Sequence, residues 1–231
     1  MPIHLLREVD KLKKQILSLG AHVEENMRNA VKAVLERDEA LAKRVIQEDH
    51  LIDTAEVDVE EECLKILALH QPVAHDLRYI VAMLKINHDL ERISDLAVTI
   101  AKRAVALCSL PEPNVEFEIS SMAEKTVQMV ARSLDALINR DANLARDNWF
   151  SDDEVDAMCA RNYDLVEEQI RKHPEHLSAL LSLLNVSRNL ERIADHATNI
   201  SKDVIYMIEG EIVRHRKRAT RQALAQSQPP S

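Results

Sequence analysis

The sequence predicts an all-α protein, and three observations lead to that prediction. The 231 residues include only two glycines and seven prolines, and aromatic residues make up just 3% of the chain. The 46% hydrophobic and 30% charged residues are dominated by Leu, Ala, Glu, Lys and Arg, which are good helix formers. Apolar residues also recur at spacings of three and four, which places them on one face of a helix, as in Leu90, Ile93, Ala97, Ile100 and Ala104.

The few strong breaks in the sequence set the lengths of the helices. They are Pro72, the segment SLPEPNVE at 109–116, Pro174 and Gly210. Because nothing comparable interrupts the pattern between them, the intervening helices must be long. In order, we predict six helices at 3–36, 39–69, 75–108, 116–140, 142–172 and 175–209.

The second half of the chain repeats the first. When the chain is aligned with itself at a shift of 100 residues, residues 86–107 match residues 186–207 at eight of 22 positions. At a shift of 103, a second block matches through Arg37, Asp38, Leu41, Ala42, Asp49 and Asp53, which pair with Arg140, Asp141, Leu144, Ala145, Asp152 and Asp156. We therefore predict two tandem three-helix bundles related by internal duplication, at 1–110 and 111–209, and a basic flexible C-terminal tail at 210–231.

An acidic pair recurs in the last predicted helix of each half. The stretch DLERISDLAVTI carries Glu91 and Asp95, and NLERIADHATNI carries Glu191 and Asp195. Residues four apart lie on the same face of a helix, so each stretch forms a patch of two carboxylates.

The helix before Pro72 carries a second acidic pair, Asp49 and Asp53, which are also four residues apart. If the two helices form an antiparallel hairpin that turns at Pro72, Asp53 and Glu91 are equally far from the turn along the chain. Asp49 and Asp95 are also equally far from Pro72, and each lies four residues farther from it than Asp53 and Glu91 do. Antiparallel helices rise equally per residue, so the four carboxylates are expected at one height.

The second half repeats this arrangement around Pro174. Asp156 and Glu191 lie on opposite sides of that proline at nearly equal separations along the chain, and the same holds for Asp152 and Asp195. A second group of four level carboxylates is therefore expected in the other bundle.

Four carboxylates at one height repel one another unless they are protonated, paired with Arg, or bridged by multivalent cations. One interpretation is therefore a pair of metal sites, with His50 and His196 as accessory ligands. The other is that both groups are solvated acidic faces partnered by Arg92 and Arg192. The candidate metal ligands are Asp49, Asp53, Glu91, Asp95, Asp152, Asp156, Glu191 and Asp195.

Several classes of protein are disfavoured. A net charge of −9 argues against a general nucleic-acid binder, because such binding depends on cationic side chains. No apolar run of about 20 residues and no secretory signal is found, so we expect a soluble cytoplasmic protein. The three isolated cysteines (Cys63, Cys108 and Cys159) are expected to be reduced packing residues. No nucleophile elbow, P-loop, dinucleotide fingerprint or ferritin-like Glu-x-x-His pattern marks an enzyme.

Three stretches resemble the PhoU family. They are QPVAHDLRYIVAMLKINHDLERISDLAVTIAKRA at 71–104, NVSRNLERIADHATNISK at 185–202, and VIQEDHLID at 45–53. The resemblance spans about residues 3–209 and implies two tandem three-helix bundles. It also implies Glu/Asp-x-x-x-Asp motifs that hold iron or zinc in some members, and these motifs fall on the eight carboxylates named above. The second half departs from the family pattern, because HPEHLS replaces the Pro-Val-Ala-x-Asp-Leu-Arg stretch.

The resemblance also implies a function. It implies a non-enzymatic negative regulator of phosphate uptake and of the phosphate-starvation response, which links the ATPase subunit of the phosphate ABC transporter to the phosphate-sensing histidine kinase. A homodimer that meets the membrane only through these partners is expected. The alternative that the residues leave open is a carboxylate-bridged metalloenzyme or a metal-storage helical bundle.

Overall fold

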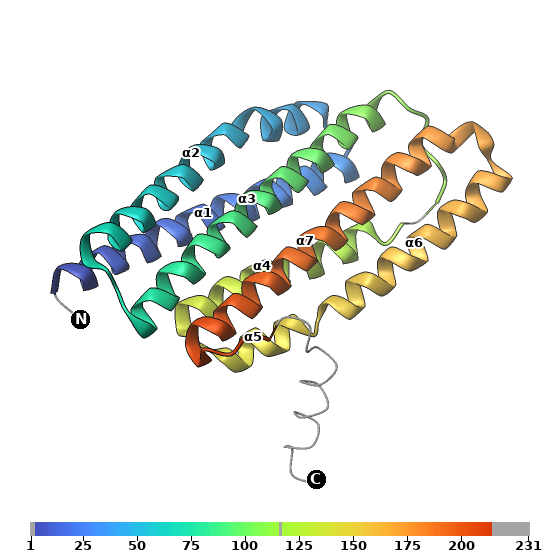
Figure 1. Ribbon diagram of the computed structural model, residues 1–231. Helices are drawn as coiled ribbons and strands as arrows, with labels where there is room; N and C mark the ends of the chain where they lie inside the picture. Colours follow the sequence, from blue (N-terminus) through green and yellow to red (C-terminus); the bar gives the residue numbers. More distant parts are fainter. Residues whose placement is uncertain (1–2, 116, 214–231) are drawn as a thin grey trace, which may run out of the picture.

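The computed structural model describes residues 3–115 and 117–213, and every regular element in those ranges is helical, as predicted (Figure 1). The elements are α1 (Ile3–Leu35), α2 (Glu39–His70), α3 (Ala74–Cys108), α4 (Ile119–Asn139), α5 (Ala142–Trp149), α6 (Asp152–Lys172), the 3₁₀ helix η1 (Pro174–His176) and α7 (Leu177–Glu209).

The prediction of a single helix at 142–172 is wrong, because two helices occupy that range. α5 ends at Trp149 and α6 begins at Asp152. Three acidic residues fill the first turn of α6, where the helix dipole favours negative charge. The sequence Ser-Asp-Asp-Glu at 151–154 is also typical of a capping box, although the Ser151 hydroxyl instead donates to the Asn148 carbonyl at 2.7 Å.

The other helix ends fall close to the predicted positions. α4 begins at Ile119, three residues later than predicted. α7 ends at Glu209 as predicted, where Gly210 adopts the left-handed conformation at φ +76°. A Cβ atom at Gly210 would lie 3.5 Å from Arg78, so the end of α7 packs closely against the start of α3.

The duplication is visible in two turns of the backbone. Arg37 follows α1 and Arg140 follows α4, and both adopt left-handed conformations, with φ of 52° and 51°. The next residues, Asp38 and Asp141, each accept a 2.9 Å hydrogen bond from the backbone N–H three residues later. The matched Arg-Asp pairs therefore end one helix and begin the next in both halves.

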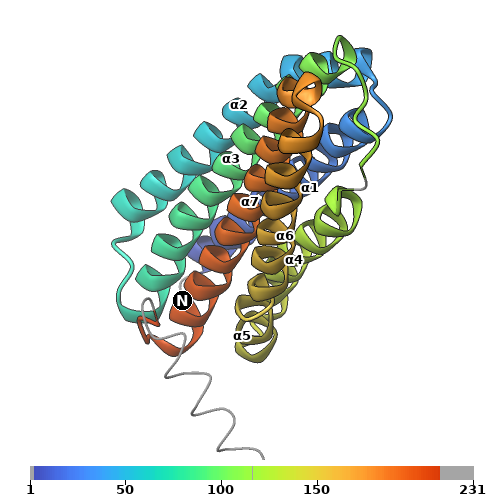
Figure 2. The same cartoon turned by 90° about the vertical axis from the view of Figure 1, so that its right-hand side faces the viewer.

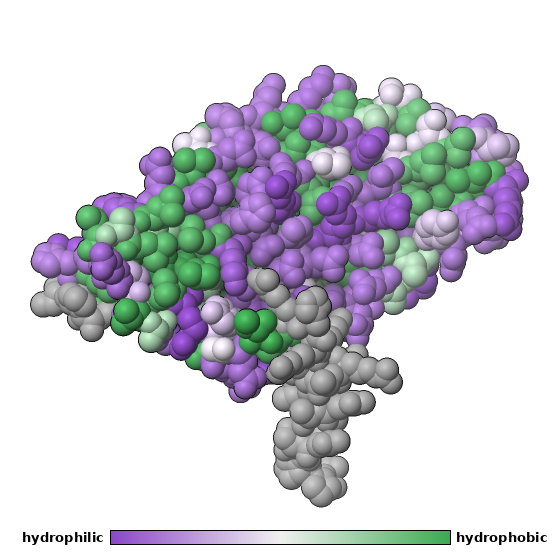
Figure 3. Space-filling view, viewed as in Figure 1, coloured by the Kyte–Doolittle hydropathy of each residue, from purple (hydrophilic) through white to green (hydrophobic). Residues whose placement is uncertain are grey.

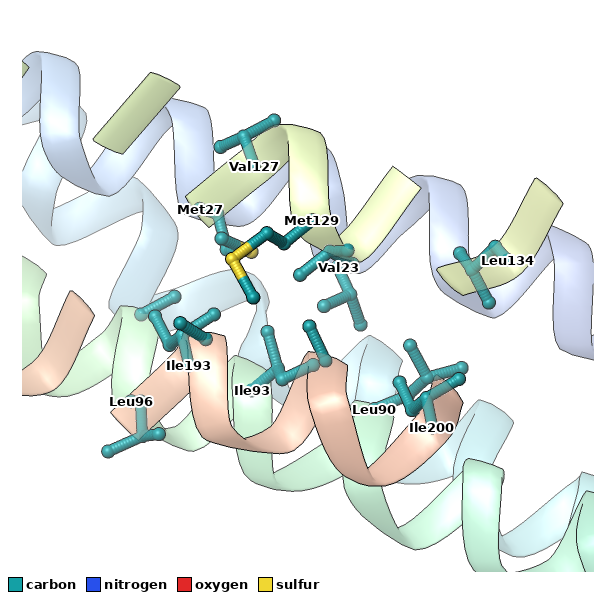
Figure 4. Close-up of a cluster of buried hydrophobic side chains, with 14 of the residues drawn as sticks. Val23, Met27, Leu90, Ile93, Leu96, Val127, Met129, Leu134, Ile193 and Ile200 are labelled. Carbon is teal, nitrogen blue, oxygen red and sulfur yellow. The ribbon is translucent and has the colours of Figure 1, made fainter. Parts of the chain in front are cut away.

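The two halves pack into one body with a shared core. α3 and α7 make the most extensive helix pair, with α2 on the other side of α3 and α6 beside α7, while α1 contacts α4 behind them (Figures 1 and 2). One continuous hydrophobic cluster includes residues of both halves. Figure 4 shows its centre, where Met27, Ile93, Met129 and Ile193 come together from four helices. The predicted pair of bundles therefore shares one core.

Most of the predicted basic tail, from residue 214 onward, lies outside the described residues. Among the helices in the described ranges, none has both the length and the apolar character needed to cross a bilayer.

Candidate metal centres

The first acidic group lies where α2 packs beside α3. The Ser94 hydroxyl of α3 donates to the Asp49 carboxylate of α2 at 2.8 Å. Burial raises the pKa of Asp49, and the Asp53 and Asp95 carboxylates raise it further, whereas Ser94 lowers it. The structure therefore brings Asp49 level with Asp95, the height at which the sequence placed them.

Glu91 completes this group from the next turn of α3. Its Oε2 atom is buried and has no hydrogen-bond partner among the described residues. Burial raises the pKa of Glu91, and the Asp95 carboxylate raises it further. Arg92 offsets part of this charge, because its Nε lies 3.4 Å from Glu91 Oε2 and its Nη1 lies 3.2 Å from Asp95 Oδ2. Two carboxylates of the first group, Glu91 and Asp95, are therefore paired with an arginine, as the second interpretation expects.

Glu56 is a further member that the sequence interpretation missed. Its carboxylate is close enough to raise the pKa of Glu91, and burial raises the pKa of Glu56 itself. Asn87 fixes the position of Glu56 by donating to its backbone oxygen at 2.8 Å and to its Oε1 at 3.3 Å. The first group thus contains five carboxylates along the boundary of α2 and α3.

The second group lies between α6 and α7. Burial raises the pKa of Asp195, and Glu191 and Asp152 raise it further, so Asp152 lies near Asp195 across the two helices. Asp152 is only 8% exposed although it is the first residue of α6. Asp156 lies one turn later on α6 and is exposed. Asp152 therefore lies near Asp195 as the count from Pro174 predicted, despite the break between α5 and α6, whereas the pairing of Asp156 with Glu191 stays a prediction.

Cys159 belongs to the second group, although the sequence interpretation treated it only as a packing residue. Its Sγ donates to Glu191 Oε2 at 3.3 Å. Burial raises the pKa of this thiol, so it remains protonated near neutral pH. At the shift of 103, Cys159 corresponds to Glu56, and at the shift of 100, Glu191 corresponds to Glu91. The same structural position therefore holds a carboxylate in one half and a thiol in the other.

The histidines suggested as accessory ligands have other partners. The Nδ1 atom of His50 lies 2.7 Å from the Gln47 carbonyl oxygen on the same helix. The Nδ1 atom of His196 lies 2.8 Å from Asp89 Oδ1, which joins α7 to α3. Only the Nε2 atom of each ring is left for another ligand.

The donor atoms suit a metal ion, but they are not arranged around one. Within residues 3–115 and 117–213, no three His, Cys, Asp or Glu side chains are close enough together to hold a metal ion. Oxygen donors match hard and borderline cations, and the buried Oε2 of Glu91 accepts no hydrogen bond among the described residues, although Arg92 Nε lies 3.4 Å from it. The side chains of Asp53, Asp95, Asp156 and Asp195 are exposed. Metal binding at these groups remains a prediction.

The raised pKa values predict that Asp49, Glu56, Glu91 and Asp195 stabilise the metal-free protein more as the pH falls from neutral toward the range in which carboxyl groups ordinarily titrate. A folded state with raised carboxyl pKa values binds more protons than the unfolded chain in this interval, so the free energy of unfolding decreases as the pH rises. Glu91→Gln removes one such group and should increase stability at pH 7 while reducing this slope. Urea unfolding of the chelator-treated wild type and variant between pH 5 and 7 measures both quantities. Identical slopes would contradict a raised pKa at Glu91.

The fold and its two acidic groups define a duplicated helical-bundle protein in which each half presents the same surface motif. The PhoU domain model matches the chain twice, at residues 16–104 and 119–204. The chain belongs to the PhoU family, and the double match confirms the predicted duplication.

Individual relatives agree with this assignment. The protein is 38% identical over 209 residues to the Pseudomonas putida "Phosphate-specific transport system accessory protein PhoU homolog", covering 90% of this chain and 82% of that protein. The Aquifex aeolicus protein of the same name is 36% identical over 211 residues, covering 91% of this chain and 96% of that one. The crystal structure of PhoU from Pseudomonas aeruginosa has a TM-score of 0.86 at 35% identity, covering 89% of this chain and 99% of that one.

Proposed function

We propose that this protein is a non-enzymatic negative regulator of phosphate uptake and of the phosphate-starvation response. The observation that carries this proposal is the double PhoU domain match, since it accounts for nearly all of the helical body. The names of the relatives link them to phosphate-specific transport as accessory proteins.

In this proposal the protein is a cytoplasmic adaptor, as a homodimer, between the ATPase subunit of the phosphate ABC transporter and a phosphate-sensing histidine kinase. Exposed apolar side chains support a docking role. On α2, Leu51 is 57% exposed and Leu64 is 53% exposed, and in the turn after α2, Val73 is 75% exposed. Figure 3 shows hydrophobic surface gathered near both ends of the α3–α7 face, with hydrophilic surface between them. Membrane association would then come through these partners.

Iron or zinc held by the acidic groups would neutralise the repelling carboxylates and rigidify the α2–α3 and α6–α7 boundaries. The oxygen donors of the first group and the thiol of Cys159 in the second are both compatible with these metals. The residues would supply ligands from two helices in each half, so a bound ion would join those helices.

Deletion of the gene should derepress alkaline phosphatase in abundant phosphate if the protein is the proposed regulator. Loss of an adaptor that keeps the kinase inactive leaves the starvation genes expressed whatever the phosphate supply. Alkaline-phosphatase activity is measured in the deletion strain, in the same strain with the wild-type gene restored, and in the parent. Activity as low in the deletion strain as in the parent would reject the regulatory role.

A further inference from the structure

A groove at the junction of α2, α3 and α7 borders the first acidic group, because Asp49 and Asp95 line it, and Arg92, Lys102 and Arg192 add three cations to its wall. Its volume is about 330 Å³. It is lined by three helices from the two halves of the protein, with α3 supplying most of the wall. A water molecule occupies roughly 30 Å³ of the liquid, so the groove has room for a small hydrated ion. The charged and imidazole side chains of its lining are Asp49, Arg92, Asp95, Lys102, Arg192 and His196.

Lys102 and Arg192 are exposed cations of this groove that are not held in a direct ion pair by any described residue. The hydrogen bonds and ion pairs between described residues do not involve Lys102 or Arg192, although Lys102 is near enough to lower the pKa of Asp49. The chain has 39 carboxylates and only 30 Lys and Arg residues, so carboxylate partners are plentiful. Elsewhere along the α3–α7 boundary a cation is paired, as Lys85 is with Asp203 at 3.1 Å. Two unpaired cations on opposite helices of one groove are suited to a shared anion.

Side chains in or beside the groove partly balance the negative charge of its two carboxylates, Asp49 and Asp95. Arg92 lies 3.2 Å from Asp95, and Ser94 donates to Asp49. His196 is held by Asp89 through Nδ1, so its Nε2 is the ring nitrogen left for the groove. An anion that carries its own O–H group would turn the remaining Asp49 oxygen from a repelling atom into a hydrogen-bond acceptor.

We infer that this groove binds inorganic phosphate, with Lys102 and Arg192 contacting its oxygens and Asp49 accepting its P–OH hydrogen. Near neutral pH, phosphate retains at least one P–OH group, whereas sulfate has the same shape without that hydrogen. A site that accepts a hydrogen bond from its ligand rejects an analogue lacking the donor. The groove is therefore expected to select phosphate over sulfate, and it would give the regulator a direct ligand.

Isothermal titration of the full-length protein with sodium phosphate tests this inference. Chelator-treated protein is used beside protein as purified, so that loss of metal and loss of phosphate binding are separated. Phosphate should bind at least tenfold more tightly than sulfate. Lys102→Gln and Arg192→Gln should each weaken phosphate binding at least tenfold, because each removes one cation from the anion.

Matched controls separate the groove from general charge effects. Arg103→Gln removes the neighbouring cation on α3, and Arg188→Gln removes the cation one turn earlier on α7, and neither residue lines the groove. Both controls should bind phosphate like the wild type. Asp49→Asn should narrow the preference for phosphate over sulfate, since the amide can donate to either anion and no longer repels the one that lacks a P–OH group.

Absence of phosphate binding to the wild type, or equal losses in the control variants, would overturn the inference. Tighter binding of phosphoserine than of phosphate would also overturn the assignment to the free ion. A regulatory role for the bound phosphate rests on the proposed function, but the titration measures binding whether or not that function is correct. A failed gene-deletion test with intact phosphate binding would reject the regulatory role alone.

Discussion

Ile93→Ala is expected to lower the free energy of unfolding by about 3 kcal/mol, because it opens a cavity in the centre of the core. Ile93 is fully buried on α3, and Figure 4 shows it beside Ile193 of α7 with Met27 and Met129 above them. The neighbouring helices belong to both halves, so the lost packing affects contacts within the first half and between the halves. Urea unfolding followed by circular dichroism measures the change.

The shared core also predicts that the two halves unfold together. Trp149 is the single tryptophan of the chain, lies in α5 of the second half, and is only 2% exposed. Its fluorescence therefore reports on the second half, whereas circular dichroism reports on all helices. In the Ile93→Ala variant both signals should shift to lower urea by the same amount.

Leu51→Ala is the control for this experiment, since Leu51 is 57% exposed on α2. It should change stability by less than about 0.5 kcal/mol. A fluorescence transition that stays at the wild-type midpoint in Ile93→Ala, while the circular dichroism transition shifts, would show that the halves are energetically independent.

Local sequence signals predicted most of the helix plan. The left-handed Arg37 and Arg140 and the helix-capping Asp38 and Asp141 repeat at a fixed shift, and they mark the same turn in each half. Gly210 ends α7 where the sequence placed that end. These positions are predictable because a cap or a left-handed residue acts through its own backbone neighbours.

The break after Trp149 was harder to predict, because no proline or glycine marks it within 142–172. The acidic first turn of α6 and the Ser-Asp-Asp-Glu stretch are local signals for a new helix, but the prediction relied on proline and glycine as the breaks between helices. Trp149 is stacked on Phe150, with ring centroids 5.2 Å apart, and is buried at this junction. The shared core depends on the packing of α1 against α4 and of α3 against α7, which sequence spacing alone does not specify.

Counting positions from each proline predicted which acidic residues lie level with one another along the helices. It predicted less well which other side chains contact them. It placed Asp49 with Asp95, and the Ser94–Asp49 hydrogen bond agrees with that height. It did not select Glu56, although Glu56 and Glu60 are also spaced four apart, because only carboxylates level with Glu91 and Asp95 by the count from Pro72 were chosen. It did not select Cys159, because Cys159 is not acidic. Following the shift of 103 to the end of the aligned block would have placed both beside the recurring Glu91 and Glu191.

The double variant Glu91→Gln, Glu191→Gln is expected to lose most of its bound iron or zinc while keeping its helical content. In each half the glutamate lies among the other candidate ligands, where its pKa or its hydrogen bond responds to them. Glutamine keeps the shape of the side chain but removes the negative charge that a cation requires. Purified proteins are loaded with ferrous or zinc salts and desalted, and their metal content is measured by mass spectrometry.

Asp58→Asn with Asp164→Asn provides the matched control, since it also removes one carboxylate from each half, but both residues are exposed and lie outside the acidic groups. This control should retain the wild-type metal content. Because no three candidate ligands are close enough to hold an ion within the described residues, binding must draw exposed side chains such as Asp95 inward. Metal loading should therefore raise the melting temperature of the wild type and the control but not of the double variant. Equal metal content in all three proteins would remove the acidic groups as the binding sites and leave Arg pairing and solvent to balance their charge.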